Sequence, residues 1–418
     1  MLDALLTYEN FQLAWRRIRN SPINTTKDRL GLKVFSQFLD IHIDTLINEL
    51  RNQTYEPQVP SIFYLPKKSG RLRPFTLLHM RDRLLYQAIC NVLIQNTYDL
   101  LKSSADKVVF SPVLAGIETD FVFYPALRKG DEFEGQFFKF IERQSKIIES
   151  GKYAYVVYAD IASFYPSIDH TLLCRKLVDK GWMDESLAHL LQNCLKVWSS
   201  SSPDLQVAKG VPTGYETSEL LASLHLYELD KAFEDSDYLR YVDDLRIYAE
   251  TEREAKKILN DVDMFLQEQG LTLQHAKSRI EELSVTTYED RLKQLENQQI
   301  LLSAIDRDVD SPDQRVQEET DAKLRALVTD LLGLDGWDIM HLDTPVELVD
   351  EAPFFFALYR MREKNTLLRD VALELIDSHP HRSYAIVRYL TLWQDDDIVK
   401  DVLWEIVDDE SRHGQVRA

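Results

Sequence analysis

Residues 238–249 read YLRYVDDLRIYA. Asp243 and Asp244 stand side by side between two short apolar and aromatic runs, which predicts a β-hairpin with the acids at its turn. In a chain with 69 acids, an acidic pair could also lie in an ordinary solvated turn. The apolar strands on both sides argue against this alternative, because a solvated turn does not require them. Adjacent carboxylates repel each other, so a cleft that keeps both ionised usually holds a cation, and oxygen ligands suit Mg²⁺ or Mn²⁺.

A second stretch also ends in a carboxylate. Residues 153–160, YAYVVYAD, form a continuous aromatic and β-branched run, which predicts a strand buried on both faces and ending at Asp160. A carboxylate in that place is costly unless it is paired or bound to a metal. If this strand lies antiparallel to the hairpin, three carboxylates meet, and two metal ions about 4 Å apart could activate a 3′-hydroxyl there. Tyr165 follows five residues later, where core packing is an equally good explanation.

Two further segments are candidates for contact with a ligand: a glycine-containing loop and a basic hairpin. Residues 209–214, KGVPTG, carry two glycines and a proline, so either a partner approaches this backbone closely or the loop simply enters the helix expected at 218–233. Residues 61–76, SIFYLPKKSGRLRPFT, predict a basic hairpin with its turn at 68–70. Most basic hairpins have no binding function. Pro74, however, stiffens the chain beside Arg73 and could aim the Arg73 guanidinium at a phosphate.

After the acidic hairpin, the sequence predicts a helix at 252–269, a strand at 271–273 and an almost entirely helical remainder from about 290. Lys277 lies four residues beyond that strand, where a lone lysine is most often exposed. The segments LLRDVALELID (367–377) and IVKDVLWEIVD (398–408) align at an offset of 31, with a further helix expected at 383–393. This repeat favours a short α-solenoid, although two similar helices could also arise by chance.

The composition indicates a soluble chain of two or three domains, with 418 residues and 44% hydrophobic content. No run of 18 apolar residues and no charged segment leading into an apolar block is present, so we expect neither a membrane span nor a secretory signal. Cys90, Cys174 and Cys194 are far apart and have no zinc-site spacing, which fits a reducing, cytoplasmic location.

The charge is unevenly distributed along the chain. Residues 281–418 hold 31 acids and 15 bases, a net of −16, whereas residues 1–100 hold 13 bases and 9 acids, a net of +4. A partner with a phosphate backbone would therefore be held by the first two thirds. The acidic tail is either a solvated structural domain or a docking surface for another protomer, a protein partner or a folded RNA.

Five segments, taken together and in order, resemble the motifs of the reverse transcriptases. ADIASFYPSID is similar to motif A, KGVPTGYETS to motif B, YVDD to motif C, GLTLQHAKS to motif D and LPKKSGRLRPF to the fingers motif, across residues 62–280. The resemblance implies an α+β right-hand polymerase with an antiparallel palm sheet. Its implied parts are N-terminal helices and fingers (1–150), a palm (151–285) and an all-α domain with possible HEAT-like repeats (286–418).

The resemblance also assigns roles to single residues. Asp160, Asp243 and Asp244, helped by the Ile161 carbonyl, would hold two Mg²⁺ ions, with Mn²⁺ as the alternative. Triphosphate contacts would come from Lys67, Arg73 and Lys277, and Tyr165 would stack under the sugar and exclude a 2′-hydroxyl. The loop residues that would support template and incoming nucleotide are Gly210, Pro212, Thr213 and Gly214.

The chain departs from the family at two positions. Thr213 stands where motif B commonly has glutamine, and Glu219 stands where a proline often follows the motif B serine. Both departures leave untemplated synthesis open beside RNA-directed synthesis. FYPSI after Asp160 and the helical tail are similar to the abortive-infection and related defence-associated bacterial reverse transcriptases, whereas no zinc-knuckle or HNH-like cluster points to an intron maturase.

The sequence therefore predicts a nucleotidyltransferase that makes DNA from dNTPs in antiphage defence. Its expected partners are an RNA, such as a dedicated non-coding template, the DNA product and, through the acidic tail, a protomer or protein. Two alternatives remain open at this point: a catalytically silent polymerase relative that acts as an RNA-binding or assembly scaffold, and an RNA-synthesising polymerase.

Overall fold

The computed structural model describes residues 1–21, 29–67, 71–125, 135–202, 205, 207–283, 300–302, 304–333 and 351–409. The chain divides into two compact units. Met1–Phe63 and Phe75–Asp290 form the first, and Tyr64–Pro74 and Arg291–Ala418 form the second. The predicted three-part division at 150 and 285 stays a prediction. Among the described helices, none combines the length and apolar character needed to span a bilayer.

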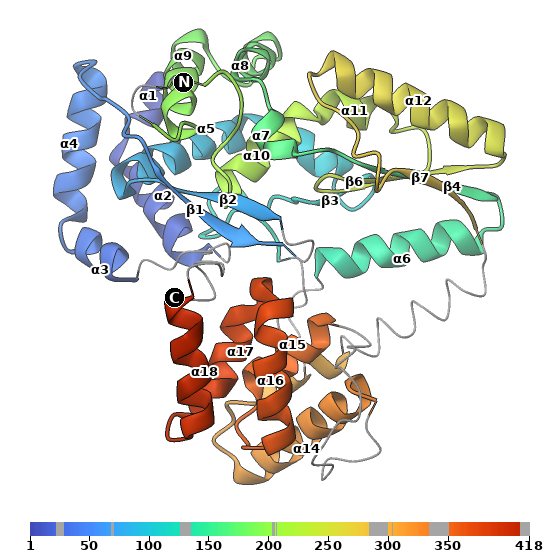
Figure 1. Cartoon of the computed structure of the whole chain (residues 1–418). Coiled ribbons are helices and arrows are strands. Elements are labelled where there is room, and N and C mark those ends of the chain that lie inside the picture. The colour runs from blue at the N-terminus through green and yellow to red at the C-terminus, as the bar shows by residue number, and fades with distance from the viewer. Residues whose placement is uncertain are drawn as a thin grey trace. The chain divides into compact units, whose positions relative to one another are not determined.

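The first unit packs helices around a five-stranded sheet (Figure 1). Its strands are β3 (Val109–Ser111), β4 (Tyr155–Asp160), β5 (Tyr238–Tyr241), β6 (Asp244–Ala249) and β7 (Arg279–Glu282). Its described helices are α1 (Leu2–Leu5), α2 (Tyr8–Asn20), α3 (Arg29–Gln37), α4 (Leu39–Arg51), α5 (Met80–Ser104), α6 (Gln136–Glu149), α7 (Phe164–Ser167), α8 (His170–Asp179), α9 (Glu185–Trp198), α10 (Glu216–His225), α11 (Tyr227–Ala232) and α12 (Glu252–Glu268). A separate two-stranded sheet joins β1 (Ser61–Pro66) and β2 (Leu72–Leu77), and the predicted turn at 68–70 lies outside the described residues.

The strand order β3-β5-β6-β4-β7 puts the two acid-bearing strands next to each other. β4 runs antiparallel to β6 and to β7, and β3 runs parallel to β5. Alternate residues of a strand face opposite sides of a sheet. Val157 and Ala159 on one face of β4 and Val156 on the other are almost completely buried, whereas Tyr158 and Asp160 are half-buried. Both faces of β4 therefore carry buried residues, as predicted, and the face that carries Asp160 becomes partly open toward the acid.

Helices α12 and α6 cover opposite faces of this sheet (Figure 1). α12 begins at Thr251, whose side chain accepts a hydrogen bond from the Glu254 amide, and it buries Ala255, Val262 and Leu266 at helical spacing. On the other face, Phe140 of α6 packs against the ring of Tyr241 at 5.3 Å. α6 thus covers the β3–β5 side of the face that carries the acids.

Two predicted elements differ in the structure. Residues 271–273 form only a single bridge, between Leu273 and Ile161, and the strand that extends the sheet is β7, Arg279–Glu282. Its sequence, RIEE, has too little apolar character to signal a strand, because β7 is an edge strand with mostly exposed side chains. The helix expected at 218–233 is also interrupted at Leu226 and forms α10 and α11.

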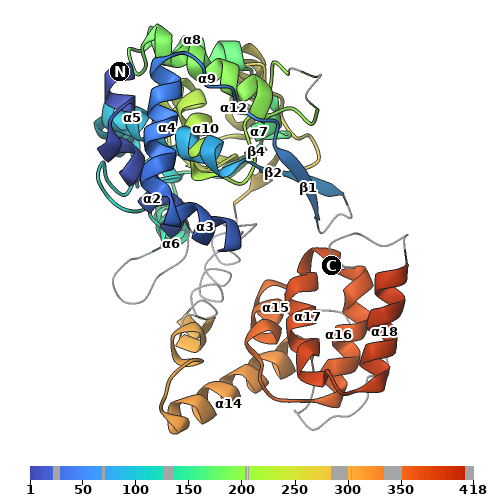
Figure 2. The same cartoon turned by 90° about the vertical axis from the view of Figure 1, so that its left-hand side faces the viewer.

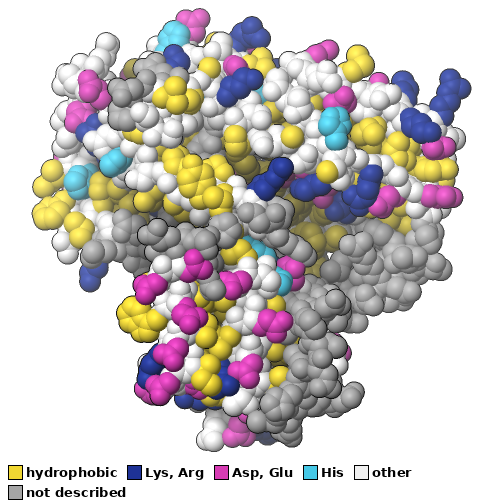
Figure 3. Space-filling view, in the orientation of Figure 1, with side chains coloured by type: hydrophobic (Ala, Val, Ile, Leu, Met, Phe, Trp, Pro, Cys, Tyr) yellow, Lys and Arg dark blue, Asp and Glu magenta, His cyan; other side chains and the backbone are white. Residues whose placement is uncertain are grey.

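The second unit has its own helical core (Figure 2). Its helices include α14 (Gln314–Leu331), α15 (Glu351–Arg360), α16 (Thr366–Ser378), α17 (Ser383–Leu390) and α18 (Asp397–Asp408). The two aligned segments of the repeat form α16 and α18. Asp and Glu side chains gather over these helices on the face drawn in Figure 3, as expected from the acidic charge of this part of the chain.

Candidate active site

The three predicted carboxylates lie at one end of neighbouring strands. Asp160 closes β4 and is the register partner of Asp244, which opens β6. Asp243 precedes Asp244 in the tight turn between β5 and β6. The structure therefore places the acid of the first motif directly beside those of the second.

The turn that presents Asp243 has a strained backbone. Val242 has a φ of +59°, a left-handed conformation that β-branched residues rarely adopt and that costs about 1–3 kcal/mol. Two hydrogen bonds hold it: the Val242 amide donates to the Ser111 carbonyl at 2.8 Å, and its carbonyl accepts from Arg240 Nη1 at 3.2 Å. The turn is thus fixed on both sides by the neighbouring strand and by one guanidinium.

Arg240 is itself fixed by a buried ion pair, which the sequence did not predict. Its Nε and Nη2 donate to the two carboxylate oxygens of Asp230, each at 2.7 Å, and Nη2 also donates to Ser223 Oγ at 3.0 Å. The Tyr238 hydroxyl donates to Asp230 at 2.9 Å. The sequence feature that could have indicated this pair is an arginine at an inward-facing position of an apolar strand, ten residues after an aspartate. This bidentate pair ties α11 to the strand that leads into the turn.

Two of the three carboxylates are paired with bases of the chain. Lys277 Nζ lies 2.9 Å from Asp160 Oδ1, and Arg246 Nη2 lies 2.9 Å from Asp244 Oδ2. The Lys277 side chain is 65% exposed, as is usual for a lysine after a strand, yet it reaches the predicted site. The backbone of its loop is also tied to β4, because the Gln274 amide donates to the Asp160 carbonyl at 2.7 Å.

Asp243 has an unfavourable electrostatic environment. Burial raises the pKa of its carboxyl above the ordinary value, and the charges of Asp160 and Asp244 raise it further, whereas Lys277 lowers it. A cation bound beside Asp243 would offset this repulsion. The arrangement therefore favours binding of positive charge at the turn.

The donor set fits a hard divalent cation. Asp160, Asp243 and Asp244 offer only oxygen ligands, which suit Mg²⁺ or Mn²⁺, and Ile161, whose carbonyl was expected to help, is buried next to Asp160. In the part of the chain that the structure describes, no three His, Cys, Asp or Glu side chains converge in metal-ligand geometry. At this site, Asp160 and Asp244 each contact a base of the chain.

The glycine loop packs closely against the segment after Asp160. Gly210 has a φ of +101°, and a Cβ atom at that position would lie 3.5 Å from the Pro166 carbonyl oxygen. The Gly210 amide donates to the Ile168 carbonyl at 2.8 Å, and the next amide, of Val211, donates to the Tyr165 carbonyl at 3.0 Å. At Gly210 the glycine is required by the positive φ, and the neighbouring protein atoms lie at ordinary contact distance. These bonds fix the backbone of Tyr165, whose half-buried ring packs on Phe164 at 5.5 Å.

The other end of this loop is joined to β2. The Thr213 amide donates to Thr76 Oγ1 at 3.2 Å, and the Thr76 amide donates to the Thr213 carbonyl at 3.1 Å. Ser218 Oγ donates to the Pro212 carbonyl at 2.5 Å, and Gly214 has a φ of +100°. Lys67 and Arg73 lie farther along the β1–β2 ribbon, in the second unit, so their predicted contact with a triphosphate stays a prediction.

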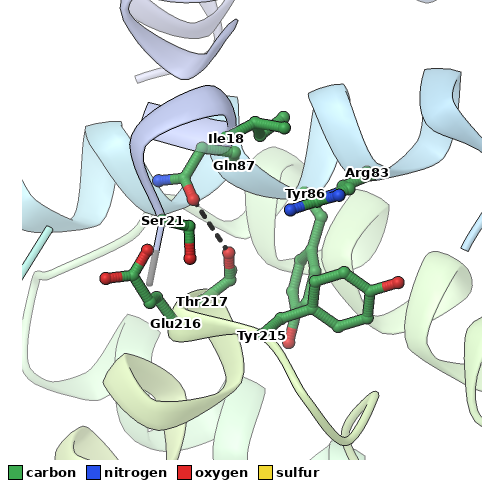
Figure 4. A pocket seen from close by; sticks show the side chains of 8 residues that line it. All are labelled: Ile18, Ser21, Arg83, Tyr86, Gln87, Tyr215, Glu216 and Thr217. Atoms are coloured by element: carbon green, nitrogen blue, oxygen red, sulfur yellow. Dashed lines mark hydrogen bonds between the residues drawn. The ribbon is translucent and has the colours of Figure 1, made fainter. Parts of the chain in front are cut away.

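Helix α10 begins directly after this loop, beside a small pocket whose lining includes Arg83, Gln87, Glu216 and Thr217 (Figure 4). Thr217 donates to Gln87 of α5 at 3.3 Å, and the Arg83 guanidinium lies over the Tyr215 ring at 5.5 Å. Burial raises the pKa of the Glu216 carboxyl. One turn later, burial and then the charge of Glu216 raise the pKa of Glu219, the residue that replaces the family's proline, to about 8.

Comparison with known proteins gives the family of this chain. A family model described as reverse transcriptase (RNA-dependent DNA polymerase) matches residues 65–299, more than half of the chain. The group II intron-encoded protein LtrA of Lactococcus lactis subsp. cremoris is 26% identical over 229 residues, which cover 54% of this chain and 34% of LtrA. Protein YkfC of Escherichia coli (strain K12) is 24% identical over 194 residues, covering 46% of this chain and 45% of YkfC. The chain thus spans less than half the length of these relatives.

Solved telomerase structures also show a distant similarity. Telomerase from Candida albicans, in complex with a TWJ fragment of telomeric RNA, aligns with a TM-score of 0.39 and 10% identity, covering 85% of this chain and 63% of that one. Apo telomerase from Candida tropicalis aligns with a TM-score of 0.39 and 11% identity, covering 88% and 74%. On the evidence of the family match, the chain belongs to the reverse transcriptase (RNA-dependent DNA polymerase) family.

Proposed function

We propose that this chain is a DNA polymerase that adds dNTPs to a 3′-hydroxyl, either on an RNA template or without a template. The observation that carries the proposal is the register of Asp160 and Asp244 on adjacent strands, with Asp243 in the turn between them, in a member of this family. Carboxylates on paired strands are held rigidly, which suits a reaction in which small displacements of ligands are costly. LtrA and YkfC extend well beyond the region that this chain matches, so the proposal concerns only the polymerase region.

Each residue of the site has a proposed role. Asp160, Asp243 and Asp244, with the Ile161 carbonyl, hold two divalent ions, which when bound activate the hydroxyl and stabilise the leaving pyrophosphate. Lys277 places its ammonium group within 2.9 Å of Asp160, where it can neutralise charge on a triphosphate. Lys67 and Arg73 bind the same triphosphate from the basic ribbon.

Tyr165 and the loop that follows position the nucleotide. The Tyr165 backbone is fixed by the Val211 amide, so its ring is held on a stable segment where it can stack under the sugar and exclude a 2′-hydroxyl. Gly210, Pro212, Thr213 and Gly214 support the template and the incoming nucleotide. Glu219, in place of a proline, puts an additional carboxyl in the first turn of α10, and this departure from the family leaves untemplated synthesis open.

We further propose that the polymerase acts in bacterial antiphage defence. The support for this role is the FYPSI sequence after Asp160 together with the helical second unit that carries the α16 and α18 repeat. The nucleic-acid partners would be a template RNA and the DNA product, while the acidic helices of the second unit would meet a protomer or a protein.

Incorporation of labelled dNTPs by the purified chain tests the proposal. The wild-type protein is expected to incorporate dNTPs only when Mg²⁺ or Mn²⁺ is present, and the Asp243→Ala/Asp244→Ala variant is expected to lose incorporation while keeping its circular dichroism spectrum. Retained incorporation in the double variant would refute the assignment. Preserved RNA binding with no metal-dependent activity in the wild type would instead identify a silent scaffold.

A further inference from the structure

The aligned helices α16 and α18 of the second unit repeat each other in structure as well as in sequence. Asn365 precedes α16, and its side chain accepts a hydrogen bond from the Leu368 amide at 2.9 Å. At the same offset of 31 residues, Asp396 precedes α18 and accepts a hydrogen bond from the Val399 amide at 3.2 Å. Arg369 of α16 pairs with Asp396 at 2.8 Å. α18 therefore occupies the equivalent place in a following repeat (Figure 2).

The apolar residues that α16 covers are exposed on α18. Leu367 of α16 is only 5% exposed, and Leu373 is partly buried against the helical core. Their counterparts in α18 are Ile398 and Trp404, which are 56% and 67% exposed. A helix at the edge of a helical-repeat array usually presents a polar outer surface. α18 instead carries the apolar residues of an internal repeat.

The helix that follows α16 indicates what kind of helix would cover α18. α17 packs against α16 and buries Ile386 and Tyr389 in the helical core. Residues 380–393, which include α17, contain Arg382 and Arg388 and no acid. The exposed acids of α16 are Asp370, Glu374 and Asp377. The repeat thus places a basic, apolar helix next to an acidic one.

α18 has the same acidic character as α16. Its single base, Lys400, is paired with Asp397 at 3.0 Å. Asp401 and Asp408 are exposed and lie three residues before and four residues after Trp404, so they share a face of the helix with it. Like charges across an interface are costly, so this face disfavours α18 of a second copy and favours a basic partner.

Residues 410–418, ESRHGQVRA, contain one bulky apolar side chain, Val416, which is too little to cover this face. We propose that Ile398 and Trp404 of α18 bind a helix of a partner protein that carries apolar residues at helical spacing and flanking Lys or Arg, as α17 does. The inference rests on the proposed contact of the second unit with a protein. It names the face and the chemistry of that contact.

A peptide with the sequence of α17 and its flanks, PHRSYAIVRYLTLW (380–393), serves as the probe. Fluorescence anisotropy of the fluorescein-labelled peptide measures its binding to the full chain. The wild type is expected to bind the peptide saturably, and Trp404→Ala is expected to weaken binding about fivefold or more. Met264→Ala is the matched control and is expected to change nothing, because Met264 is 64% exposed but lies on α12 of the first unit.

Two further changes test the charge complementarity. Asp401→Asn is expected to weaken peptide binding about two- to threefold and to reduce its dependence on salt. A peptide with Arg382→Glu and Arg388→Glu keeps every apolar residue but is expected to bind about tenfold more weakly. Equal binding of the two peptides, or wild-type affinity in Trp404→Ala, would overturn the inference.

Sedimentation over a range of protein concentrations tests the other occupant. A wild-type dimer that Trp404→Ala converts to a monomer would identify a second copy of the chain on α18 and would overturn the inference. Failure of the proposed polymerase gives a different result. If the wild type incorporates dNTPs but does not bind the peptide, the polymerase assignment stands and the α18 site is wrong. If it binds the peptide but incorporates no dNTPs, the reverse holds.

Discussion

Asp160 and Asp244 lie directly opposite each other on β4 and β6, and each is paired with a base of the chain, Lys277 or Arg246, at 2.9 Å. These pairs keep the acids and bases of the site together before any substrate arrives. Because the Lys277 side chain is mostly exposed, its pairing with Asp160 is weak and can be exchanged for a cation on the acid and a phosphate on the lysine.

Asp243 is expected to reduce the stability of the metal-free protein. Its folded-state pKa is raised by burial and by Asp160 and Asp244, so the native state binds this proton more tightly than the unfolded state, and stability falls as the pH rises through that range. Asp243→Asn should therefore raise the free energy of unfolding at pH 7 by about 0.5–2 kcal/mol while abolishing incorporation. Urea unfolding in EDTA measures this, and a less stable Asp243→Asn protein would contradict it.

The buried Asp230–Arg240 pair should be essential for the fold around the turn. Asp230→Asn leaves the Arg240 guanidinium buried without its charge partner, which is expected to cost about 3–5 kcal/mol. Glu234→Gln, which breaks the exposed Lys231–Glu234 pair nearby, should cost less than about 1 kcal/mol. Chemical denaturation of both variants makes the comparison, and equal costs would show that the buried pair does not support the turn as described.

A side chain at Gly210 should be destabilising because of the backbone conformation. At a φ of +101°, alanine is strained, although its Cβ would make only ordinary van der Waals contacts with Pro166 and Ser199, at 3.5–3.7 Å. Gly210→Ala is expected to lower both stability and incorporation, because the loop also fixes the Tyr165 backbone. Gly151→Ala is the matched control: its φ is +65° and nothing lies within 4 Å of the added atom, so only about 1 kcal/mol should be lost and incorporation should be kept.

Glu219 should make stability depend on pH above the usual carboxylate range. Its pKa is raised to about 8, whereas an unfolded glutamate titrates at about 4.3. The native state therefore holds the proton that the unfolded state has lost, and the stability present at low pH is lost progressively between about pH 4 and pH 8. The urea unfolding midpoint should drop between pH 6 and pH 9, and the drop should be larger for the wild type than for Glu219→Gln. An equal drop in the two proteins would mean that the pKa of Glu219 is not raised.

The sequence predicted the elements whose signals are local. The apolar runs around Asp243 and Asp244 gave the hairpin, and the β-branched run before Asp160 gave β4, because burial of at least one face imposes that pattern. The partial exposure of Tyr158 could not be read from the same run, since a tyrosine is a good strand residue and here also packs against two arginines.

The remaining parts depend on pairing between distant segments. β7 exists because Arg279–Glu282 pairs with β4, and its polar sequence carries no strand signal of its own. The role of Arg240 follows from Asp230 lying beside it after α11 and β5 have packed, which spacing alone does not show. The same holds for the Val242 turn, whose conformation is imposed by hydrogen bonds from β3 and Arg240 against the preference of valine.

Incorporation of dNTPs by the Asp160→Asn variant measures whether Asp160 belongs to the same catalytic centre as Asp243 and Asp244. Asp169→Asn is the matched control, because Asp169 caps α8 by accepting from the Leu172 amide and asparagine caps equally well. We expect Asp160→Asn to remain folded but to lose incorporation by about a thousandfold or more, while Asp169→Asn keeps it. A folded Asp160→Asn protein with incorporation within tenfold of the wild type would place Asp160 outside the catalytic centre.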